Sequence, residues 1–231
     1  MIIVIGHKGE VGSALFQLCE EKLKDTIKGV DKNGAIDIVR HRIGKEDEPV
    51  DFMHVCIPWS EKFEKIVQGY MVLYEPEITI IHSTVPVGTT RRLNAYHSPV
   101  RGVHPNMMRG LLGYVKFYAP LNGLIQGHFE SLGMNVFGCD YPEDTELLKL
   151  MSTTYYGILI AWAGEVKRMC DKNGTDWSEW EHWVRTTNDH TPRPLLQPPK
   201  KRIGGHCILP NSELLDKQFP SSLTKEVLKW K

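Results

Sequence analysis

The first twelve residues constrain the fold more than any other part of the chain. An apolar run over residues 1–5 passes directly into a loop with three glycines, Gly6, Gly9 and Gly12, and apolar residues then recur at helical spacing over 14–19. This order predicts a buried strand, a tight turn and a helix. Glycines at such a turn let backbone N–H groups and the helix N-terminus approach a phosphate group. The segment is therefore typical of a dinucleotide-binding Rossmann unit.

An acidic residue follows the loop at the spacing such a unit requires. Asp31 ends the second predicted strand, over 26–30, about 20 residues after the glycines, where a carboxylate holds the hydroxyls of the adenosine ribose. A carboxylate there repels a 2′-phosphate, so NAD is predicted over NADP, and Lys32 weakens this preference only slightly. The alternative is a Rossmann-like domain that binds no nucleotide. We assign the following residues to the cofactor site: Gly6, His7, Lys8, Gly9, Glu10, Val11, Gly12, Asp31, Lys32, Cys56, Ile57, Pro58, Ser83 and Thr84.

The rest of the first half alternates strand and helix signals. Apolar strands are predicted over 52–57 and 78–82, with a helix from 63 to 70 between them, and 36–39 is a short strand or a loop piece. Such alternation implies parallel βαβ units in a doubly wound sheet. The predicted fold class is α/β, with an NAD-binding Rossmann domain over 1–140.

One long helix dominates the second half. It is predicted from Pro142 to about Lys172, where Asn173-Gly174 ends it, and a shorter helix follows around 177–185. The long helix is apolar over much of its circumference, which is typical of a helix buried on several sides. We predict a small all-helical substrate and dimerisation domain over 141–231.

Composition excludes several classes of partner. Lys plus Arg and Asp plus Glu both total 28, so the formal net charge is zero, which argues against nucleic acid or an anionic membrane surface as the main partner. No apolar run approaches the length of about 18 residues that a membrane helix needs. The five widely spread cysteines favour neither a disulfide framework nor a zinc site, and a cytoplasmic protein with a small-molecule substrate and no metal is predicted.

Further segments resemble the nucleotide-sugar 6-dehydrogenases. Ser83–Thr90 resembles the STVPxGTT segment of that family, Glu146–Leu150 the start of its long central helix, and Pro192–Pro198 with Ile203–Ile208 the segment that bears its cysteine. The Gly-Gly-His-Cys form ending at Cys207 is most similar to the UDP-N-acetylmannosamine branch. The motifs occur in the family's order over almost the whole chain.

The resemblance implies a site and a chemistry. In the family a hydroxymethyl group is oxidised twice by NAD. A cysteine, matched here by Cys207, captures the intermediate aldehyde. A lysine, matched here by Lys149, stabilises the developing alkoxide. Thr84 matches a threonine near the reacting centre. The long helix builds a homodimer in the family, and a homodimer is expected here.

Several positions depart from the family pattern. Thr153 stands where the family has asparagine, Asn211 where it has aspartate, and Asn106, in the segment that begins at His104, where it has a carboxylate used in hydrolysis. The 24 residues after Cys207 are too few for the family's third, UDP-binding domain. We therefore expect a single two-electron oxidation, or the reverse reduction, of a sugar-like or smaller hydroxylated substrate.

Two other functions remain open. A β-hydroxyacid type dehydrogenase also uses a lysine on a long helix after its Rossmann domain, and Cys207 would then be dispensable. A non-catalytic NAD-binding regulatory protein would bind NAD without reducing it. Cys207 can equally be an inert core residue, and His104 a strand-end histidine. The candidate catalytic residues are Thr84, His104, Asn106, Lys149, Thr153 and Cys207.

Overall fold

The computed structural model describes residues 1–23, 25–32, 36–39, 48–102, 105–191, 200–204 and 207–231, with the backbone alone at 36–39. The chain divides into two compact units, Met1–Leu147 and Leu148–Lys231. The boundary falls inside the long helix α6, Pro142–Asn173. Each unit is described by itself below.

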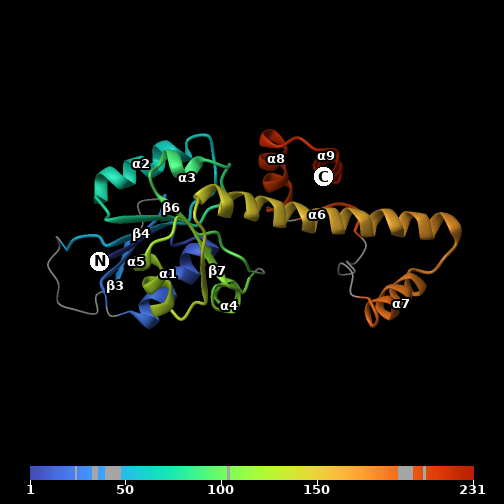
Figure 1. The fold of residues 1–231 in the computed structure, drawn as a ribbon, viewed down its shortest axis with the longest axis horizontal. Coiled ribbons are helices and arrows are strands. Elements are labelled where there is room, and N and C mark those ends of the chain that lie inside the picture. The colour runs from blue at the N-terminus through green and yellow to red at the C-terminus, as the bar shows by residue number, and fades with distance from the viewer. Residues whose placement is uncertain (24, 33–35, 40–47, 103–104, 192–199, 205–206) are drawn as a thin grey trace. The chain divides into compact units, whose positions relative to one another are not determined.

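Unit 1, Met1–Leu147, is built on a six-stranded sheet (Figure 1). Its strand order is β3-β2-β1-β4-β5-β6, and all neighbours are parallel except β2 and β3. The strands are β1 Ile2–Ile5, β2 Ile27–Val30, β3 Ile36–Val39, β4 Phe52–Val55, β5 Ile78–Ile81 and β6 Tyr96–His97. The Rossmann prediction is confirmed, and 36–39 is a strand. β3 runs antiparallel to β2, because the few residues between these two strands leave no room for the crossover that a parallel partner needs.

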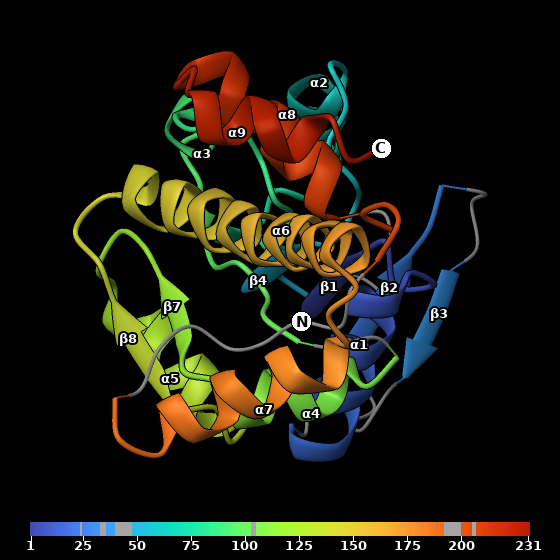
Figure 2. The same cartoon turned by 90° about the vertical axis from the view of Figure 1, so that its right-hand side faces the viewer.

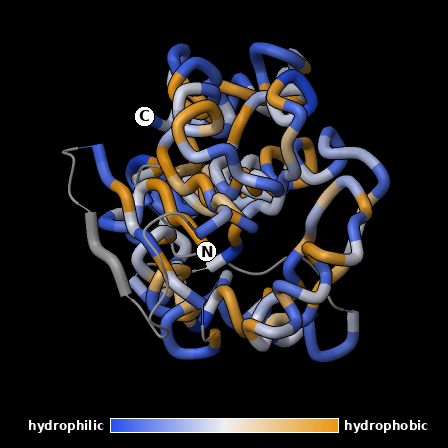
Figure 3. The backbone as a smooth tube through the Cα atoms, turned by 90° about the vertical axis from the view of Figure 1, so that its left-hand side faces the viewer, coloured by the Kyte–Doolittle hydropathy of each residue, from blue (hydrophilic) through white to orange (hydrophobic). Residues whose placement is uncertain are grey.

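Helices cover both faces of this sheet, as a doubly wound fold requires. One face packs against α1 Glu10–Lys22, α4 Met107–Gly113 and α5 Gly123–Ser131, and the other against α2 Phe63–Tyr74 and the segment of α3 Thr89–Arg92 (Figure 1). Alternate residues of a strand serve the two cores: Ile2 and Ile80 lie in the first, Ile3 and Ile81 in the second. Hydrophilic residues, blue in Figure 3, predominate in the outer turns.

A second, two-stranded sheet completes unit 1. Its parallel strands are β7 Lys116–Tyr118 and β8 Val136–Gly138, which α5 connects. An isolated antiparallel bridge between His97 and Ala119 joins β6 to the residue after β7, and the N–H of His97 donates to the Ala119 carbonyl oxygen at 2.8 Å. This bridge brings β7 close to the carboxyl end of β6.

Unit 2, Leu148–Lys231, has helices as its regular elements within its described residues, joined by irregular segments. It contains most of α6, then α7 Trp177–Asn188, α8 Ile208–Gln218 and α9 Ser222–Leu228. Figure 2 shows α8 and α9 together beside α6. The approach is close at Gly157, where a Cβ atom would lie 2.7 Å from Ile208. The predicted helical second domain is confirmed.

The long helix is less covered than its sequence predicts. Its bounds match the prediction, and Gly174, with φ of +75°, follows its last residue. Apolar side chains nevertheless remain exposed along it: Leu148, Met151, Tyr155, Tyr156, Trp162 and Met169. The expected burial on several sides is therefore wrong for this chain taken alone, because the core of unit 2 covers only part of the helix. No helix in the described part of the chain has the length and apolar character needed to cross a membrane.

Candidate functional site

The glycine loop joins β1 to α1 in a turn that only small residues permit. Gly6 has φ of +82°, in the left-handed region, and its N–H donates to the Val30 carbonyl oxygen at 2.7 Å. A Cβ atom on Gly12 would lie 2.1 Å from the carbonyl oxygen of Gly6, so the helix could not approach the turn. Gly9 precedes the first helical residue, and in the described structure no side chain caps this end of α1. The backbone N–H groups at a helix start of this kind can donate hydrogen bonds to a phosphate oxygen.

Asp31 lies beside this loop. Strand register pairs Ile5 with Val30, so Gly6 and Asp31, the next residues, leave the sheet at the same edge. Asp31 is half-buried and Lys32 is exposed. A carboxylate at this position can accept hydrogen bonds from the hydroxyl groups of a sugar.

The other residues of the predicted loop take different positions. Lys8 is exposed, whereas His7 is buried, with its ring 5.6 Å from that of Phe16. The ring also covers Gly29 of β2, where a Cβ atom would lie 2.4 Å from it. His7 therefore contributes its backbone to the loop and its side chain to the packing of the loop on β2. Glu10 and Val11, in the first turn of α1, are half-buried.

The ends of β4 and β5 meet the loop at the same edge. The Cys56 N–H donates to Ile5 at 2.9 Å, and the Ser83 hydroxyl donates to the carbonyl oxygen of Ile57 at 2.5 Å. Pro58 follows and is exposed. Burial raises the pKa of the Cys56 thiol to about 12, so this thiol remains protonated at neutral pH. Cys56 therefore lines the edge of the sheet as a neutral group.

A buried carboxylate holds the turn that carries Thr84. Both oxygens of Glu146, near the start of α6, accept hydrogen bonds: Oε2 from the Gly88 N–H at 2.6 Å, and Oε1 from the Thr90 N–H at 2.8 Å and the Thr90 hydroxyl at 2.6 Å. Glu146 is completely buried, and this burial raises the pKa of its carboxyl although the hydrogen bonds act in the opposite direction. Thr84 itself is half-buried.

Two further contacts fix the same turn. His97 donates from Nε2 to the Ser83 carbonyl oxygen at 3.2 Å, and its Nδ1 pairs with the Thr145 hydroxyl at 2.8 Å. Arg91 and Glu143 form a two-pronged ion pair at the surface. The start of α6 is thus tied to the segment 83–91 directly by Glu143 and Glu146, and through His97 by Thr145.

Sequence reasoning included Glu146 in a motif but assigned it no role. Glu146 and Leu150 are both buried, and residues four apart share one face of a helix. An acidic residue near the start of a helix, on its apolar face, is the signal that could have identified it.

Asn106 lies beside the first helix of unit 1. It is exposed, immediately precedes α4, and borders a hollow of about 580 Å³ whose other wall is the outer surface of α1, with Glu10, Ser13 and Gln17. The structure therefore brings Asn106 together with the helix that follows the glycine loop. His104, the other candidate of this segment, lies outside the described residues.

Lys149 and Thr153 lie one turn apart on α6, in unit 2. Both are half-buried, and the Thr153 hydroxyl donates to the Lys149 carbonyl oxygen at 2.9 Å. Positions four apart present their side chains on one face, so these two candidates are neighbours.

Cys207 immediately precedes α8 and is half-buried. Thr154 of α6 contacts Ser212 through their hydroxyl oxygens, 3.2 Å apart, and Gly157 faces Ile208. These contacts run in opposite order along the two helices, so the start of α8, with Cys207, lies alongside the part of α6 that follows Thr153. Asn211, one turn into α8, is buried and donates its N–H to the Cys207 carbonyl oxygen at 3.1 Å. The preceding Gly205 and His206 lie outside the described residues.

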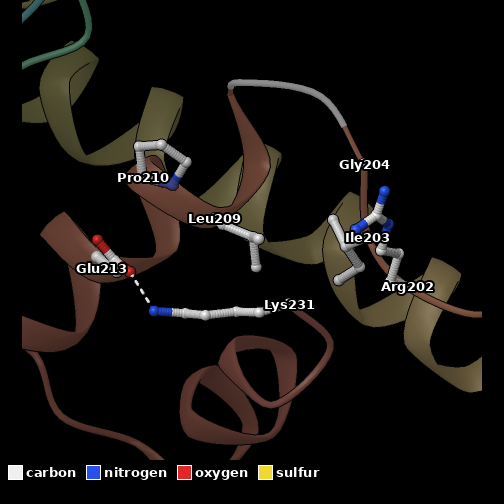
Figure 4. Close-up of a pocket in the computed structure, with 7 residues that line it drawn as sticks. All are labelled: Arg202, Ile203, Gly204, Leu209, Pro210, Glu213 and Lys231. Atoms are coloured by element: carbon white, nitrogen blue, oxygen red, sulfur yellow. Dashed lines mark hydrogen bonds and ion pairs between the residues drawn. The ribbon is translucent and has the colours of Figure 1, made fainter.

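A hollow of about 470 Å³ opens beside this segment (Figure 4). Gly204 and Leu209, which flank the Cys207 segment in sequence, line it, together with Arg202 and an ion pair between Glu213 and Lys231 at 2.7 Å. Within the described residues, no group of three histidine, cysteine, aspartate or glutamate side chains is arranged to hold a metal ion.

Comparison with known proteins gives sequence relatives of one kind and fold relatives of two kinds. No family model matches the chain. The UDP-N-acetyl-D-mannosamine dehydrogenase of Methanococcus vannielii is 25% identical over 225 residues, which cover 86% of this chain and 51% of that protein. The chain spans about half the length of the curated relatives it matches in this way.

Solved structures confirm the fold. UDP-D-ManNAc dehydrogenase from Pyrococcus horikoshii superimposes with a TM-score of 0.79 at 18% identity, covering 99% of this chain and 67% of that one. A 3-hydroxyisobutyrate dehydrogenase from Mycobacterium tuberculosis gives 0.70 at 12% identity, but there the match covers 99% and 91% of the two chains.

Proposed function

This chain is related in sequence to the UDP-N-acetylmannosamine dehydrogenases among the nucleotide-sugar dehydrogenases, and from that premise we propose that it is an NAD-dependent oxidoreductase. Its substrate would carry a CH–OH group on a sugar-like or small hydroxylated molecule, oxidised in one two-electron step or formed by the reverse reduction. The observation that carries the proposal is the edge of the sheet at which the glycine turn, Asp31 and the Thr84 turn leave neighbouring strands.

The described residues fit a dinucleotide. The glycine turn leaves the start of α1 open for a pyrophosphate, and Asp31 would receive the ribose hydroxyls. A carboxylate at that position disfavours a 2′-phosphate, which supports NAD over NADP. When bound there, NAD supplies a hydride acceptor for the carbon that carries the substrate hydroxyl.

The candidate catalytic groups divide into two roles. Lys149, on α6, would stabilise the alkoxide that develops as the hydroxyl loses its proton, as the matching lysine does in the resembled family. Thr84 matches a threonine that lies near the reacting centre in that family. Thr153 and Asn106 would position the substrate by hydrogen bonds. Cys207 would act only if an aldehyde is captured for a second oxidation, and Thr153, Asn211 and Asn106 replace residues that this step uses in the resembled family. We therefore propose a single oxidation.

The second candidate is a β-hydroxyacid type dehydrogenase. The observation that favours it is the match to 3-hydroxyisobutyrate dehydrogenase structures over nearly their whole length, against about two thirds for the nucleotide-sugar enzymes. A lysine on the long helix serves both candidates, whereas Cys207 serves only the first. The predicted division into an NAD-binding domain over 1–140 and a substrate domain over 141–231 applies to either.

We also propose that the chain acts in the cytoplasm as a homodimer formed through α6. The exposed apolar side chains of that helix, including Trp162 and Tyr155, support a partner surface. A monomer mass by light scattering at micromolar concentration would contradict this.

The proposal is tested by NADH formation, followed by absorbance, with NAD and a panel of UDP-sugars, sugars, sugar acids and hydroxy acids. One NADH per substrate molecule is expected, and two would contradict the single oxidation. Full turnover by Cys207→Ala would favour the second candidate over a cysteine-dependent reaction, with Cys139→Ala as the control variant. NAD binding without turnover on any class would instead support a non-catalytic regulatory protein.

A further inference from the structure

The hollow that Asn106 borders has a volume of about 580 Å³, which suits a small molecule. One wall is the surface of α1, with Glu10 and Ser13 from its first turn, and the other wall is the segment 105–112. All of these residues belong to unit 1. Glu10 is the first residue of α1, directly after the glycine loop. The hollow therefore begins beside the turn to which the phosphates of NAD are assigned.

Arg109, on α4, brings a guanidinium group to this hollow. It is exposed and, among the described residues, its side chain makes no ion pair and no hydrogen bond. Arg91 and Arg92 are each bound to a glutamate carboxylate, and Arg101 donates to the carbonyl oxygen of Val115 at 2.6 Å. Within the described part of unit 1, Arg109 is thus the one arginine whose side-chain donors are open to a ligand.

The chemistry of this group selects the ligand. An arginine stays charged at every physiological pH, and its paired N–H donors match the geometry of a carboxylate or a phosphate. Hydrogen bonds between two charged groups are about twice as strong as those between neutral groups. Arg109 therefore favours a ligand that carries an oxyanion.

The two walls of the hollow differ in charge. The α4 side has the cation of Arg109 and the exposed amide of Asn106. The α1 side has Glu10, the other ionisable side chain among the described lining residues, and its carboxylate disfavours an anion there. The rest of the lining includes apolar side chains: Ala14, Met107, Met108 and Leu112. This arrangement favours a ligand with its oxyanion at the α4 wall and an uncharged part at the α1 wall.

We propose that this hollow binds the substrate and that Arg109 holds an oxyanion of the substrate, a carboxylate or a phosphate. The inference rests on the proposed oxidation of a CH–OH group. It narrows the substrate class to acidic hydroxylated compounds and excludes neutral sugars. Asn106 binds an oxygen next to the oxyanion, and the hydroxyl-bearing part lies along α1, on the side of the glycine loop. Arg109 takes no part in hydride transfer, so its loss raises KM and leaves kcat nearly unchanged.

Binding to the full chain tests this site without turnover. The amide NMR signals of Ser13, Asn106 and Arg109 are followed as the ¹⁵N-labelled protein is titrated with gluconate, with inorganic phosphate, or with sorbitol, the neutral counterpart of gluconate. We expect saturable shifts with at least one anion and none with sorbitol. A response to gluconate alone identifies a carboxylate, and a response to phosphate alone identifies a phosphate. Equal responses to gluconate and sorbitol, or no response to either anion, would overturn the proposal.

Variants of Arg109 assign the response to its side chain. Arg109→Gln should weaken anion affinity about tenfold or more, because a hydrogen-bonded ion pair is lost. Arg109→Lys should recover part of this loss, since an ammonium keeps the charge but not the paired donors. The control Lys65→Gln removes an exposed charge from α2 and should leave the affinity unchanged. An affinity that Arg109→Gln leaves intact would contradict the assignment.

The pyrophosphate of NAD is a second source of oxyanions beside this hollow. The same titration is therefore repeated with NAD at saturation. Shifts that persist support a substrate site. Their loss when NAD is bound would assign Arg109 to the cofactor and overturn the substrate proposal.

Kinetics complete the test once the NADH assay has identified a substrate. Arg109→Gln should raise KM about tenfold and change kcat by less than about threefold. A neutral sugar oxidised as efficiently as the matching acid would overturn the narrowed substrate class. The two proposals fail separately: saturable anion binding without NADH formation from any compound would retain the Arg109 site and remove the proposed oxidation.

Discussion

Unit 1 and unit 2 secure their candidate residues in different ways. Unit 1 has two large apolar cores and buried polar side chains, such as Glu146 and His97, that bind the turns around its sheet. Unit 2 has a small core that consists of Ile160, Ala161, Ile203, Ile208, Val227 and Trp230. Its helix α7 buries no residue at all. The difference indicates that the predicted cofactor residues are positioned by their own unit, whereas unit 2 leaves apolar surface that a partner could cover.

The largest expected effect is the response of unit 1 to acid. His128 has a pKa lowered from 6.5 to about 4, so the unfolded chain binds more protons in this range, and stability is lost as pH falls from 6.5 towards 4. A shift of this size amounts to about 3 kcal/mol, and His54 and His82 add to it. In unit 2, His182 and His190 are exposed.

Hydrogen exchange measured by mass spectrometry from pH 7 to 4 tests this contrast. We expect unit 1 to lose protection first, and His128→Gln to reduce the pH dependence, with His190→Gln as the control. Loss of protection in unit 2 before unit 1 would break the comparison.

Gly12→Ala should have the next largest effect, because the new methyl group would lie 2.1 Å from a backbone oxygen that cannot rotate away. We expect a loss of about 3 kcal/mol in the free energy of unfolding, together with weaker NAD binding. Gly69→Ala, in α2 with no atom within 4 Å of its Cβ position, is the matched control and should stabilise by about 0.5 kcal/mol. Equal stability of the two variants in urea would refute the close packing of the glycine loop.

Glu146→Gln tests the hydrogen bonds by which Glu146 holds Gly88 and Thr90 in the turn that follows Thr84. The amide keeps one acceptor oxygen but turns an NH₂ group towards an N–H or hydroxyl donor, so we expect a loss of about 2 kcal/mol. Glu20→Gln, at an exposed position on α1, should change stability by less than about 0.5 kcal/mol. Thermal unfolding of both variants gives the comparison, and a Glu146→Gln protein as stable as the wild type would show that these hydrogen bonds do not stabilise the turn.

Gly164→Ala, in unit 2, should have the smallest effect. It tests whether unit 2 is packed less tightly than unit 1. The methyl group would lie 2.3 Å from the Trp230 ring and 2.9 Å from the Lys200 carbonyl oxygen. The closer of the two neighbours is a side chain at the edge of a small core, which can shift more readily than a backbone atom. We expect a loss of about 1 kcal/mol, visible in Trp fluorescence during urea unfolding. Gly127→Ala, with no atom near its Cβ position, is the control. A loss larger than that of Gly12→Ala would mean that unit 2 is the more tightly packed unit.

The fold could be predicted because its signals are local. Apolar runs mark β1, β4 and β5, and Pro142 and Gly174 mark the ends of α6. The antiparallel β3 was missed because strand direction depends on the length of the connection, not on the strand's own residues. The exposure of α6 was missed because apolar content does not show how many neighbours a helix has.

The site was predictable only where motifs are contiguous. Gly6, Gly12 and Asp31 lie close together through adjacent strands, as their spacing predicts. The hydrogen bonds of Glu146 with Thr90, and those that His54 makes with His82 and His128, join residues tens of positions apart, which no periodicity links. The predicted roles of Lys149, Thr153 and Cys207 stay predictions.

The central claim, an NAD site at the carboxyl edge of the unit 1 sheet, is tested most directly by calorimetric titration of the full chain with NAD and with NADP. The account predicts saturable binding of NAD and weaker binding of NADP, with Asp31→Ala losing about tenfold in NAD affinity and Asp25→Ala, an exposed control, unchanged. No heat of binding with either nucleotide, or tighter binding of NADP, would contradict it.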